Sequence, residues 1–287
     1  MIYSYNLHGN DESFCKIPDA KWKIEECDND LIRECIDKKL TVVEISFGNE
    51  FNEPIEAVSE LASLEYIAFG KRFNKPIKCL SKCVHLTHIV FGEKFNKSIQ
   101  SFANRAQLTF IQFGNKFDQS IKALAKCTNL QQIIFGECFN RSIEALADCT
   151  TLRQITFGFY FNQPIEALAK CTNLQQITFG YHFNQPVETI TYGNLQIRFG
   201  GAFNQPIEAI AKCSNLQKIT FSSHFNQPIE ALASCTCLQQ IIFGSDFNQP
   251  IEALAKCVCL ETIIFEGESQ FNQSTSDLIN KVHIEYV

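Results

Sequence analysis

Hydrophobic and polar positions recur along this chain with a period of 22 residues. Each period begins with Phe followed by Asn or Asp, and one copy reads FNQPIEALAKCTNLQQITFG from Phe161 to Gly180. A fixed period of roughly 20 to 30 residues predicts a solenoid, whose units bury their apolar faces only against their neighbours. The Phe residues that open the periods are Phe51, Phe73, Phe95, Phe117, Phe139, Phe161, Phe183, Phe203, Phe225, Phe247 and Phe271.

Two elements are predicted within each period, counted with the opening Phe as position 1. Position 4 is Pro or Ser, and the apolar residues at positions 5, 8 and 9 have helical spacing, which predicts at most two turns of helix. Positions 14 to 19 alternate between inward and outward residues, which predicts a β-strand that ends at the Gly of position 20. We therefore expect an arc with parallel β-strands on its concave face and short helices or helical turns on its convex face.

Three residue types form columns when such coils are stacked about 4.8 Å apart. Phe fills positions 1 and 19 with 22 of the 26 Phe residues, which predicts two stacks of buried rings. Asn at position 2 is expected to bond the backbone of the coil. Cys at position 11 is expected to be a buried, reduced thiol. The seven residues of this cysteine column are Cys83, Cys127, Cys149, Cys171, Cys213, Cys235 and Cys257.

The two ends of the chain differ from the repeats and are predicted to be caps. We expect an N-terminal cap at residues 1–39, a solenoid of about ten repeats at residues 40–270, and a C-terminal cap at residues 271–287. Residues 28–39 have the pattern of a charged amphipathic helix, and Trp22 is expected to pack in the same cap. A helix is predicted over residues 274–282, and a last edge strand over residues 283–287.

The sequence motifs of the repeat resemble those of a known family. Phe-Asn-x-Pro-Ile and Ile-Thr-Phe-Gly at this period resemble the FNIP repeat, a leucine-rich-repeat relative abundant in amoebae and their giant DNA viruses. The segment C-T-N-L-Q-Q-I is also similar to BspA-like leucine-rich repeats. The resemblance covers about residues 40–275 and implies a leucine-rich-repeat arc with a binding role. Many family members carry an F-box that implies recruitment to a ubiquitin ligase, and residues 1–39 contain no match to it.

Composition and motifs argue against a membrane protein and against an enzyme. The net charge is -6, and no apolar run approaches the roughly 20 residues that a membrane span needs. The first residues lack a secretory signal, so we expect a cytoplasmic protein, in host-cell cytoplasm if it is viral. No phosphate loop, G-x-S-x-G or H-E-x-x-H is present, so no catalytic residue and no cofactor are expected.

Two groups of residues raise the question of a metal site or a disulfide. Cys79, Cys83, His85 and His88 have zinc-like spacing, but the repeat register places Cys83 inward and His88 outward, so no metal site is expected. Cys237 and Cys259 both occupy position 13 in neighbouring coils. Whether they form a disulfide stays open at this point.

A row of three aromatic residues interrupts the outward positions of the strands. Gln and Thr are the commonest residues at positions 16 and 18, but position 16 holds Tyr66, His88 and Phe110 in three consecutive coils. Exposed aromatic residues of this kind anchor protein partners. The alternative is that the three rings only pack on one another as cross-strand neighbours.

Positive charge is concentrated in the same coils. Residues 71–126 contain eleven Lys or Arg against Glu93 and Asp118, whereas residues 1–70 contain six basic and fifteen acidic groups. Arg72, Lys94 and Lys116 share position 22, so like charges are stacked in a column. The column predicts a positive field that steers an acidic partner. The alternative is a solvated face that balances the acidic cap.

A second aromatic group lies at positions 21 and 22 of two later coils. It consists of Phe159, Tyr160, Tyr181 and His182, and it predicts either a contact site or a seam for self-association. Together these features favour a non-enzymatic scaffold that binds a protein partner through its concave face and basic N-terminal repeats. The alternative is a structural or self-associating repeat protein. A nucleic-acid-binding or ubiquitin-ligase adaptor role is less favoured, because the flanks are acidic and no F-box is found.

Overall fold

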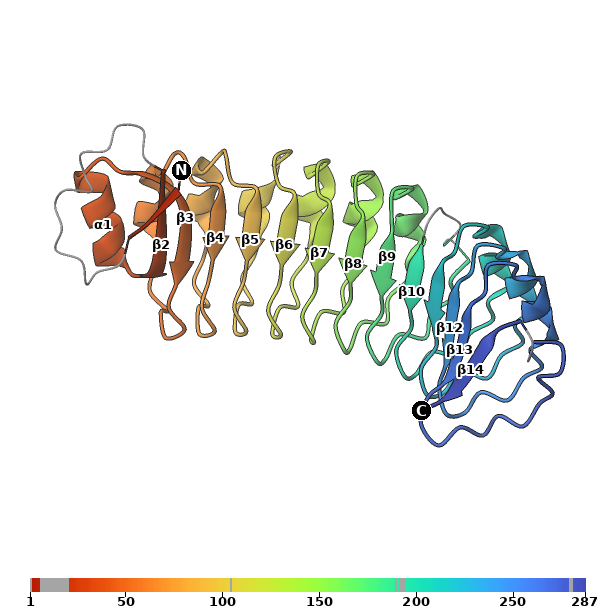
Figure 1. Cartoon of the computed structure of the whole chain (residues 1–287). Helices are drawn as coiled ribbons and strands as arrows, with labels where there is room; N and C mark the ends of the chain where they lie inside the picture. The colour runs from red at the N-terminus through yellow and green to blue at the C-terminus, as the bar shows by residue number, and fades with distance from the viewer. Residues whose placement is uncertain (1, 6–20, 104, 189, 191–194, 279–280) are drawn as a thin grey trace. The chain divides into compact units, whose positions relative to one another are not determined.

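The computed structural model describes residues 2–5, 21–103, 105–188, 190, 195–278 and 281–287. The chain divides into two compact units, Met1–Phe139 (unit 1) and Asn140–Val287 (unit 2), which are described separately (Figure 1). In each unit every coil contributes one strand that pairs in parallel with the strand of the next coil. The predicted repeat solenoid is thereby confirmed.

Unit 1 contains one α-helix and a run of parallel strands that follow one another in chain order. The register advances by one repeat at each step, so that Tyr66 pairs with His88 and His88 with Phe110. The described strands are β1 Ile2–Tyr5, β2 Lys21–Cys27, β3 Thr41–Phe47, β4 Tyr66–Ala68, β5 His88–Val90, β6 Phe110–Gln112 and β7 Gln132–Ile134, and the helix is α1 Asn29–Asp37.

Unit 2 repeats the same arrangement from β8 to the last strand of the chain. Its register is also kept from coil to coil, although the third coil has only 20 residues: Gln176 pairs with Gln196, and Gln196 with Lys218. The described strands are β8 Gln154–Thr156, β9 Gln176–Thr178, β10 Gln196–Arg198, β11 Lys218–Thr220, β12 Gln240–Phe243, β13 Thr262–Phe265 and β14 His283–Tyr286.

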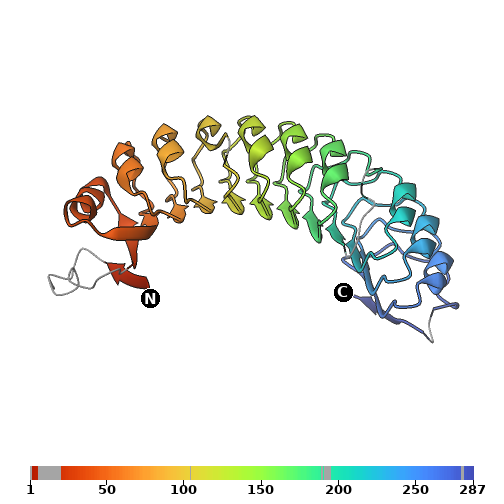
Figure 2. The same cartoon turned by 90° about the horizontal axis from the view of Figure 1, so that it is seen from above.

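In most coils the segment after Phe-Asn or Phe-Asp forms a 3-10 turn on the side of the coil opposite the strand (Figure 2). Its hydrogen bonds run from Leu168 N to Ile165 O, from Cys171 N to Leu168 O and from Leu174 N to Cys171 O. These residues occupy positions 5, 8, 11 and 14, and all are at most 2% exposed. A 3-10 helix has three residues per turn, so an apolar period of three gives it one continuous buried face. The expectation of helical turns is confirmed, and the turn type follows from this period.

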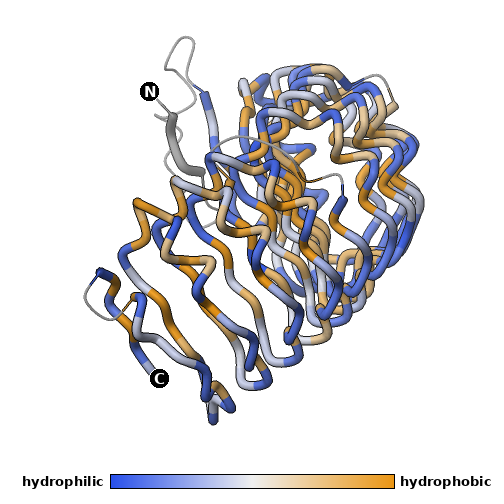
Figure 3. The backbone as a smooth tube through the Cα atoms, turned by 90° about the vertical axis from the view of Figure 1, so that its right-hand side faces the viewer, coloured by the Kyte–Doolittle hydropathy of each residue, from blue (hydrophilic) through white to orange (hydrophobic). Residues whose placement is uncertain are grey.

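The 3-10 turns recur in both units. In unit 1 they are η2 Glu56–Glu60, η3 Lys78–Lys82, η4 Gln100–Phe102 and η5 Lys122–Lys126. In unit 2 they are η6 Glu144–Asp148, η7 Glu166–Lys170, η8 Glu208–Lys212, η9 Glu230–Ser234 and η10 Glu252–Lys256. Hydrophobic segments recur at the same place in successive coils, as the coloured tube shows (Figure 3).

The two Phe columns form the core that joins neighbouring coils, as predicted. In unit 1 the rings of Phe69 and Phe91 lie 5.5 Å apart and those of Phe73 and Phe95 lie 6.1 Å apart. Within one coil Phe69 stacks on Phe73 at 4.1 Å, which ties the two columns together. Each fully buried Phe side chain stabilises the fold by about 1.5–3 kcal/mol, so these columns supply much of the cohesion.

The Asn column forms a ladder that links the coils outside the core. Asn162 Oδ1 accepts a hydrogen bond from the backbone N of Asn184 at 2.9 Å and another from Nε2 of Gln185 at 3.1 Å. The same pair of bonds recurs in unit 2 from Asn140 onward. The predicted role of Asn in bonding the backbone is confirmed.

Gly at position 20 fits the close approach of successive turns in most coils, and Ser222 and Glu266 are the exceptions. A Cβ added to Gly92 would lie 1.9 Å from the carbonyl O of Gly70. The same contact recurs in unit 2, where a Cβ on Gly180 would lie 1.8 Å from the carbonyl O of Gly158. Gly48 opens the column, and a Cβ there would meet nothing within 4 Å.

The caps hold some of the predicted elements and two strands, β1 and β2, that the sequence analysis did not predict. Helix α1 begins after Asp28, whose Oδ1 accepts from Leu31 N at 2.8 Å, and it buries Leu31, Ile32 and Cys35. Trp22 is 2% exposed, as expected, but it lies on a strand, β2, that was not predicted.

At the other end β14 confirms the expected edge strand. The helix expected over residues 274–282 is a turn at residues 276–278, and residues 279–280 lie outside the described part.

Candidate interaction surfaces

The aromatic row of unit 1 lies on the outer face of three adjacent strands. Tyr66, His88 and Phe110 are register partners, with ring centroids 6.4 Å apart between Tyr66 and His88 and 5.8 Å apart between His88 and Phe110. His88 is exposed and the other two are half-buried. The rings therefore pack on one another and still present part of their surface to solvent.

The basic column of unit 1 lies in the turns beyond the strand ends. Arg72, Lys94 and Lys116 are all exposed, and the turn is held by bonds such as that from Lys94 N to Lys71 O at 2.9 Å. Nη1 of Arg72 lies 2.6 Å from Oε2 of Glu50, so one of the three cations is already paired. In the described part of unit 1, no carboxylate lies within 4.0 Å of the ammonium group of Lys94 or Lys116.

One residue of the basic segment does not contribute to a surface charge. Arg105 is only 8% exposed and occupies position 11, which is Cys in seven other coils. Its guanidinium donates hydrogen bonds to the carbonyl oxygens of Cys83 and Leu80, while its Nε has no partner. Burial lowers the pKa of Arg105. The exposed positive charge of this segment is therefore smaller than the sequence count suggested.

Four rings form an exposed cluster, the rim cluster, in unit 2. Phe159 stacks on Tyr181 at 5.2 Å and Tyr160 stacks on His182 at 5.3 Å, while Phe159 and Tyr160 meet edge to face. The exposed fractions of the first three are 42% for Phe159, 50% for Tyr160 and 42% for Tyr181. The other face of Tyr181 covers Gly201 of the next coil, where an added Cβ would lie 2.4 Å from the ring. The structure thus brings all four predicted residues together.

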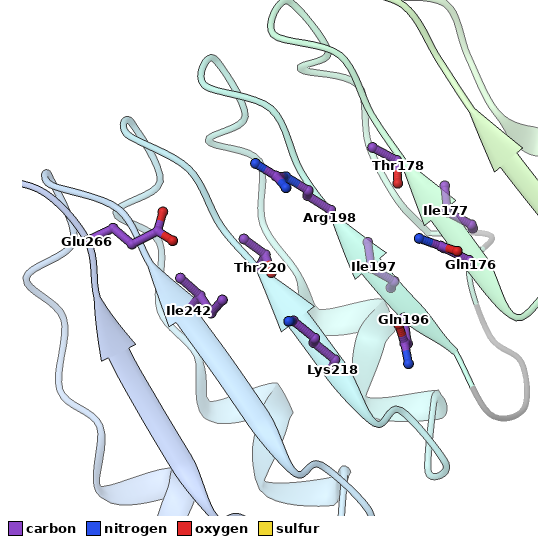
Figure 4. A pocket seen from close by; sticks show the side chains of 10 residues that line it. All are labelled: Gln176, Ile177, Thr178, Gln196, Ile197, Arg198, Lys218, Thr220, Ile242 and Glu266. Atoms are coloured by element: carbon purple, nitrogen blue, oxygen red, sulfur yellow. The ribbon is translucent and has the colours of Figure 1, made fainter. Parts of the chain in front are cut away.

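The sequence analysis missed a hollow on the outer face of strands β9 to β12 in unit 2 (Figure 4). Its volume is about 250 Å³, and charged side chains of Arg198, Lys218 and Glu266 contribute to its lining. A signal was present, because Arg198 is the one cation at position 18 of the strands and Glu266 replaces the turn Gly of position 20. The hollow is complete within unit 2.

The cysteine and histidine groups are dispersed. Cys83 Sγ donates to Val58 O at 3.4 Å inside the core, whereas His88 is exposed on the sheet. Among the described residues no group of three or more His, Cys, Asp or Glu is placed to hold a metal. Cys237 and Cys259 are both free thiols.

Burial changes the acidity of the cysteine column. It raises the pKa of Cys83, Cys127 and Cys171 to about 11, because the thiolate form would lose its hydration in the core. These thiols are therefore protonated near neutral pH, which makes them poor nucleophiles and poor metal ligands. No helix in the described part of the chain is long and apolar enough to cross a bilayer.

Comparisons with known proteins place the fold. No protein-family model and no curated protein matches the chain. An internalin, InlF from Listeria monocytogenes, is similar with a TM-score of 0.69 and 16% identity, over 92% of this chain and 77% of its own. The circular leucine-rich-repeat protein CroV588 is similar with a TM-score of 0.66 and 25% identity, over 93% of this chain and 43% of its own.

A third structure, the complex of TLR13 with ssRNA13, is similar with a TM-score of 0.72 and 10% identity. That likeness covers 95% of this chain and 47% of the TLR13 chain. The chain therefore spans less than half the length of two of these three proteins. The parallel strands, the 3-10 turns and these likenesses together show that the chain has a leucine-rich-repeat fold.

Proposed function

We propose that the chain is a non-enzymatic scaffold that binds an acidic, partly apolar protein partner through unit 1. The observation that carries the proposal is the aromatic row, in which three successive coils present stacked rings at an outward position that is mostly Gln or Thr elsewhere. Packing of the core does not need these rings, because the inward position next to them is Ile in each strand. Partly exposed aromatic residues are typical anchors of protein interfaces.

The basic column supplies the second part of the proposed surface. Lys94 and Lys116 are exposed and lack ion-pair partners within the described residues of unit 1, so their field is available to a partner. Charges of this kind raise the association rate more than the final affinity. We also propose that the repeats belong to the FNIP type and that the protein works in a reducing compartment, which the buried free thiols support.

Affinity capture from a host-cell lysate, read by quantitative mass spectrometry, tests this function. The full chain is compared with a Tyr66→Ser and Phe110→Ser variant and with a Lys94→Glu and Lys116→Glu variant. We expect the proteins captured by the unchanged chain to fall about tenfold or more with either variant. A Lys170→Glu and Lys212→Glu variant of unit 2 is the matched control. Capture that is equal for all four proteins contradicts the proposal.

A second candidate function, self-association, is favoured by the rim cluster. Three of its rings are 42–50% exposed, which is unusual for large apolar groups on a monomer surface. Sedimentation velocity over a hundredfold range of concentration tests it, with Phe159→Ser and Tyr181→Ser as the variant. A dimer that the variant abolishes supports this candidate, whereas a strict monomer at every concentration excludes it.

A further inference from the structure

We propose that the hollow of unit 2 binds an extended peptide segment of a partner that presents an acidic and a basic side chain on the same face. The acidic side chain pairs with Arg198 and Lys218, and the basic side chain pairs with Glu266. This site is separate from the aromatic row and basic column of unit 1. It does not depend on the function proposed for them.

The floor of the hollow is formed by outward strand positions that are nevertheless covered. Thr220 on β11 and Ile242 on β12 are 6% and 9% exposed, although their counterparts on most strands are half-exposed. Gln176 on β9 and Gln196 on β10 contribute amide groups. A partner would therefore contact mainly the exposed amide groups of Gln176 and Gln196, which lie beside the covered Thr220 and Ile242.

The walls carry unpaired charge of both signs. Arg198 lies beside Thr220 in the strand register, and Lys218 lies beside Gln196. Figure 4 shows the side chains of Arg198 and Glu266 extending toward each other from either side of the row that holds Thr220 and Ile242. Among the described residues no ion pair joins any of the three charged groups to a partner. The hollow is therefore cationic on the β10 and β11 side and anionic on the β13 side.

Glu266 is at position 20, which is Gly in the other coils except for Ser222. The backbone N of Glu266 still donates to Phe243 O at 2.8 Å, so the coil stacking is kept while a carboxylate is added at the end of β13. Core packing gains nothing from this side chain, since Glu266 is exposed. The added carboxylate changes the hollow from a cationic site to a site with two opposite charges.

The size and the charges of the hollow fit a peptide better than the other ligands. Its volume of about 250 Å³ is below the roughly 300–1,000 Å³ of small-molecule sites and is open to solvent along the sheet. In an extended segment, residues two or four positions apart lie on one face, about 7 or 13 Å from each other. Three strand spacings of about 4.8 Å separate β10 from β13, and the side chains of Arg198 and Glu266 shorten that span. Nucleic acid is disfavoured because Glu266 would repel phosphate.

Selection from a phage-displayed library of random twelve-residue peptides tests the proposal on the immobilised full chain. We expect enriched peptides to carry Asp or Glu two or four positions from Lys or Arg. An Arg198→Gln and Lys218→Gln variant is expected to lose the acidic preference, and Glu266→Gln the basic preference, each with about tenfold weaker binding of the enriched peptides. Matched controls are Lys212→Gln with Lys256→Gln, and Glu252→Gln, all exposed on 3-10 turns of unit 2.

Several outcomes overturn the proposal. The proposal is wrong if selection on the unchanged chain enriches no peptides with such a charge pair. It is also wrong if the charge pair is enriched and its preference remains in both the Arg198→Gln and Lys218→Gln variant and the Glu266→Gln variant. Full competition by a free zwitterionic amino acid at millimolar concentration would show a small-molecule site instead. Binding of a twelve-nucleotide RNA that is lost with Arg198→Gln and Lys218→Gln would show a phosphate site. Lys94→Glu with Lys116→Glu is expected to leave the selection unchanged, which separates this site from the function proposed for unit 1.

Discussion

The two units of this protein share one scaffold and differ in the chemistry of the same exposed positions. At position 22 of the turns unit 1 places Arg72, Lys94 and Lys116, whereas unit 2 places Tyr160 and His182. Both units keep the stacked Phe columns, and both hold Gly at position 20 in most coils, with Ser222 and Glu266 as the exceptions in unit 2. The difference teaches that packing fixes the inward positions of the repeat and leaves the turn tips and outward strand positions free to vary.

The Asn ladder shows a more gradual difference between the units. In unit 2 each ladder Asn from Asn140 to Asn248 accepts from a backbone N and from the Gln amide of position 3. In unit 1 position 3 holds Lys75 and Lys97, so Asn52 and Asn74 each accept one of these two bonds. Lys in place of Gln at position 3 thus adds positive charge to unit 1 and removes one hydrogen bond to the ladder Asn in each of two coils.

The largest effect is expected from Gly92→Ala in unit 1 and Gly180→Ala in unit 2. The added methyl group would lie 1.9 Å and 1.8 Å from a carbonyl O of the preceding turn, so backbone must move. We expect each change to lower the free energy of unfolding by about 3 kcal/mol or more, measured by urea denaturation.

Gly48→Ala is the matched control, because nothing lies within 4 Å of the new methyl group. It is expected to change the stability by less than about 0.5 kcal/mol. Equal losses in the two units would show that the scaffold is common to both. A loss in only one unit would break that comparison.

Arg105→Cys tests the one interruption of the cysteine column in unit 1. The change removes a buried guanidinium that has no carboxylate partner in the described structure and restores the residue of the other coils. We expect the free energy of unfolding to rise by about 1–3 kcal/mol. The reciprocal change in unit 2, Cys171→Arg, is expected to lower it by at least as much. Destabilisation by Arg105→Cys would show instead that the hydrogen bonds to Leu80 and Cys83 hold these coils together.

Alanine replacements in the Asn ladder sharpen the comparison of the two units. Asn162→Ala in unit 2 leaves two donors without their acceptor, whereas Asn74→Ala in unit 1 leaves one. We expect losses of about 2 kcal/mol and about 1 kcal/mol in the free energy of unfolding. A larger loss for Asn74→Ala than for Asn162→Ala, in the same urea experiment, would refute the idea that the ladder is stronger in unit 2.

The smallest effect on the free energy of unfolding at neutral pH is expected from the buried thiols, and it is expected to be equal in the two units. The pKa of Cys83 in unit 1 and that of Cys171 in unit 2 are raised to about 11, from an ordinary value of 9.0. The unfolded chain therefore loses these protons first. Stability is expected to be constant below about pH 9 and to fall between about pH 9 and pH 11. Chemical denaturation at a series of pH values measures this dependence.

Thiol alkylation at pH 8 provides an independent check on the same residues. A pKa two units higher leaves about a hundredfold less thiolate, so the buried thiols are expected to react at least tenfold more slowly than the exposed Cys259. Peptide mapping after a timed reaction identifies which residues were modified. Equal reaction of Cys83 and Cys259 in folded protein would contradict the buried column.

The period of the sequence determined most of the scaffold. Inward Phe, Leu and Ile can be buried only if neighbouring coils stack in register. The strands and their order could therefore be predicted from the spacing of these residues in the repeat. The 3-10 form of the turns was also encoded, in the apolar spacing of three at positions 5, 8, 11 and 14, but the α-helical spacing at positions 5, 8 and 9 obscured it. Strands β1 and β2 were missed because they lie outside the repeat.

Only the tertiary structure decided which exposed residues act together. The rim cluster could be located from the sequence, because equal positions of adjacent coils are neighbours. The sequence marked Arg198 and Glu266 as unusual residues but did not locate the hollow. It forms because both side chains extend over residues of the coils between them, and the repeat period does not predict how far a side chain extends. Likewise the sequence analysis included Arg105 among the basic residues of the surface. In the structure Arg105 is buried and donates hydrogen bonds to carbonyl oxygens of the preceding coil. Local spacing fixes which backbones are adjacent, but the direction and pairing of long polar side chains depend on neighbours from several coils at once.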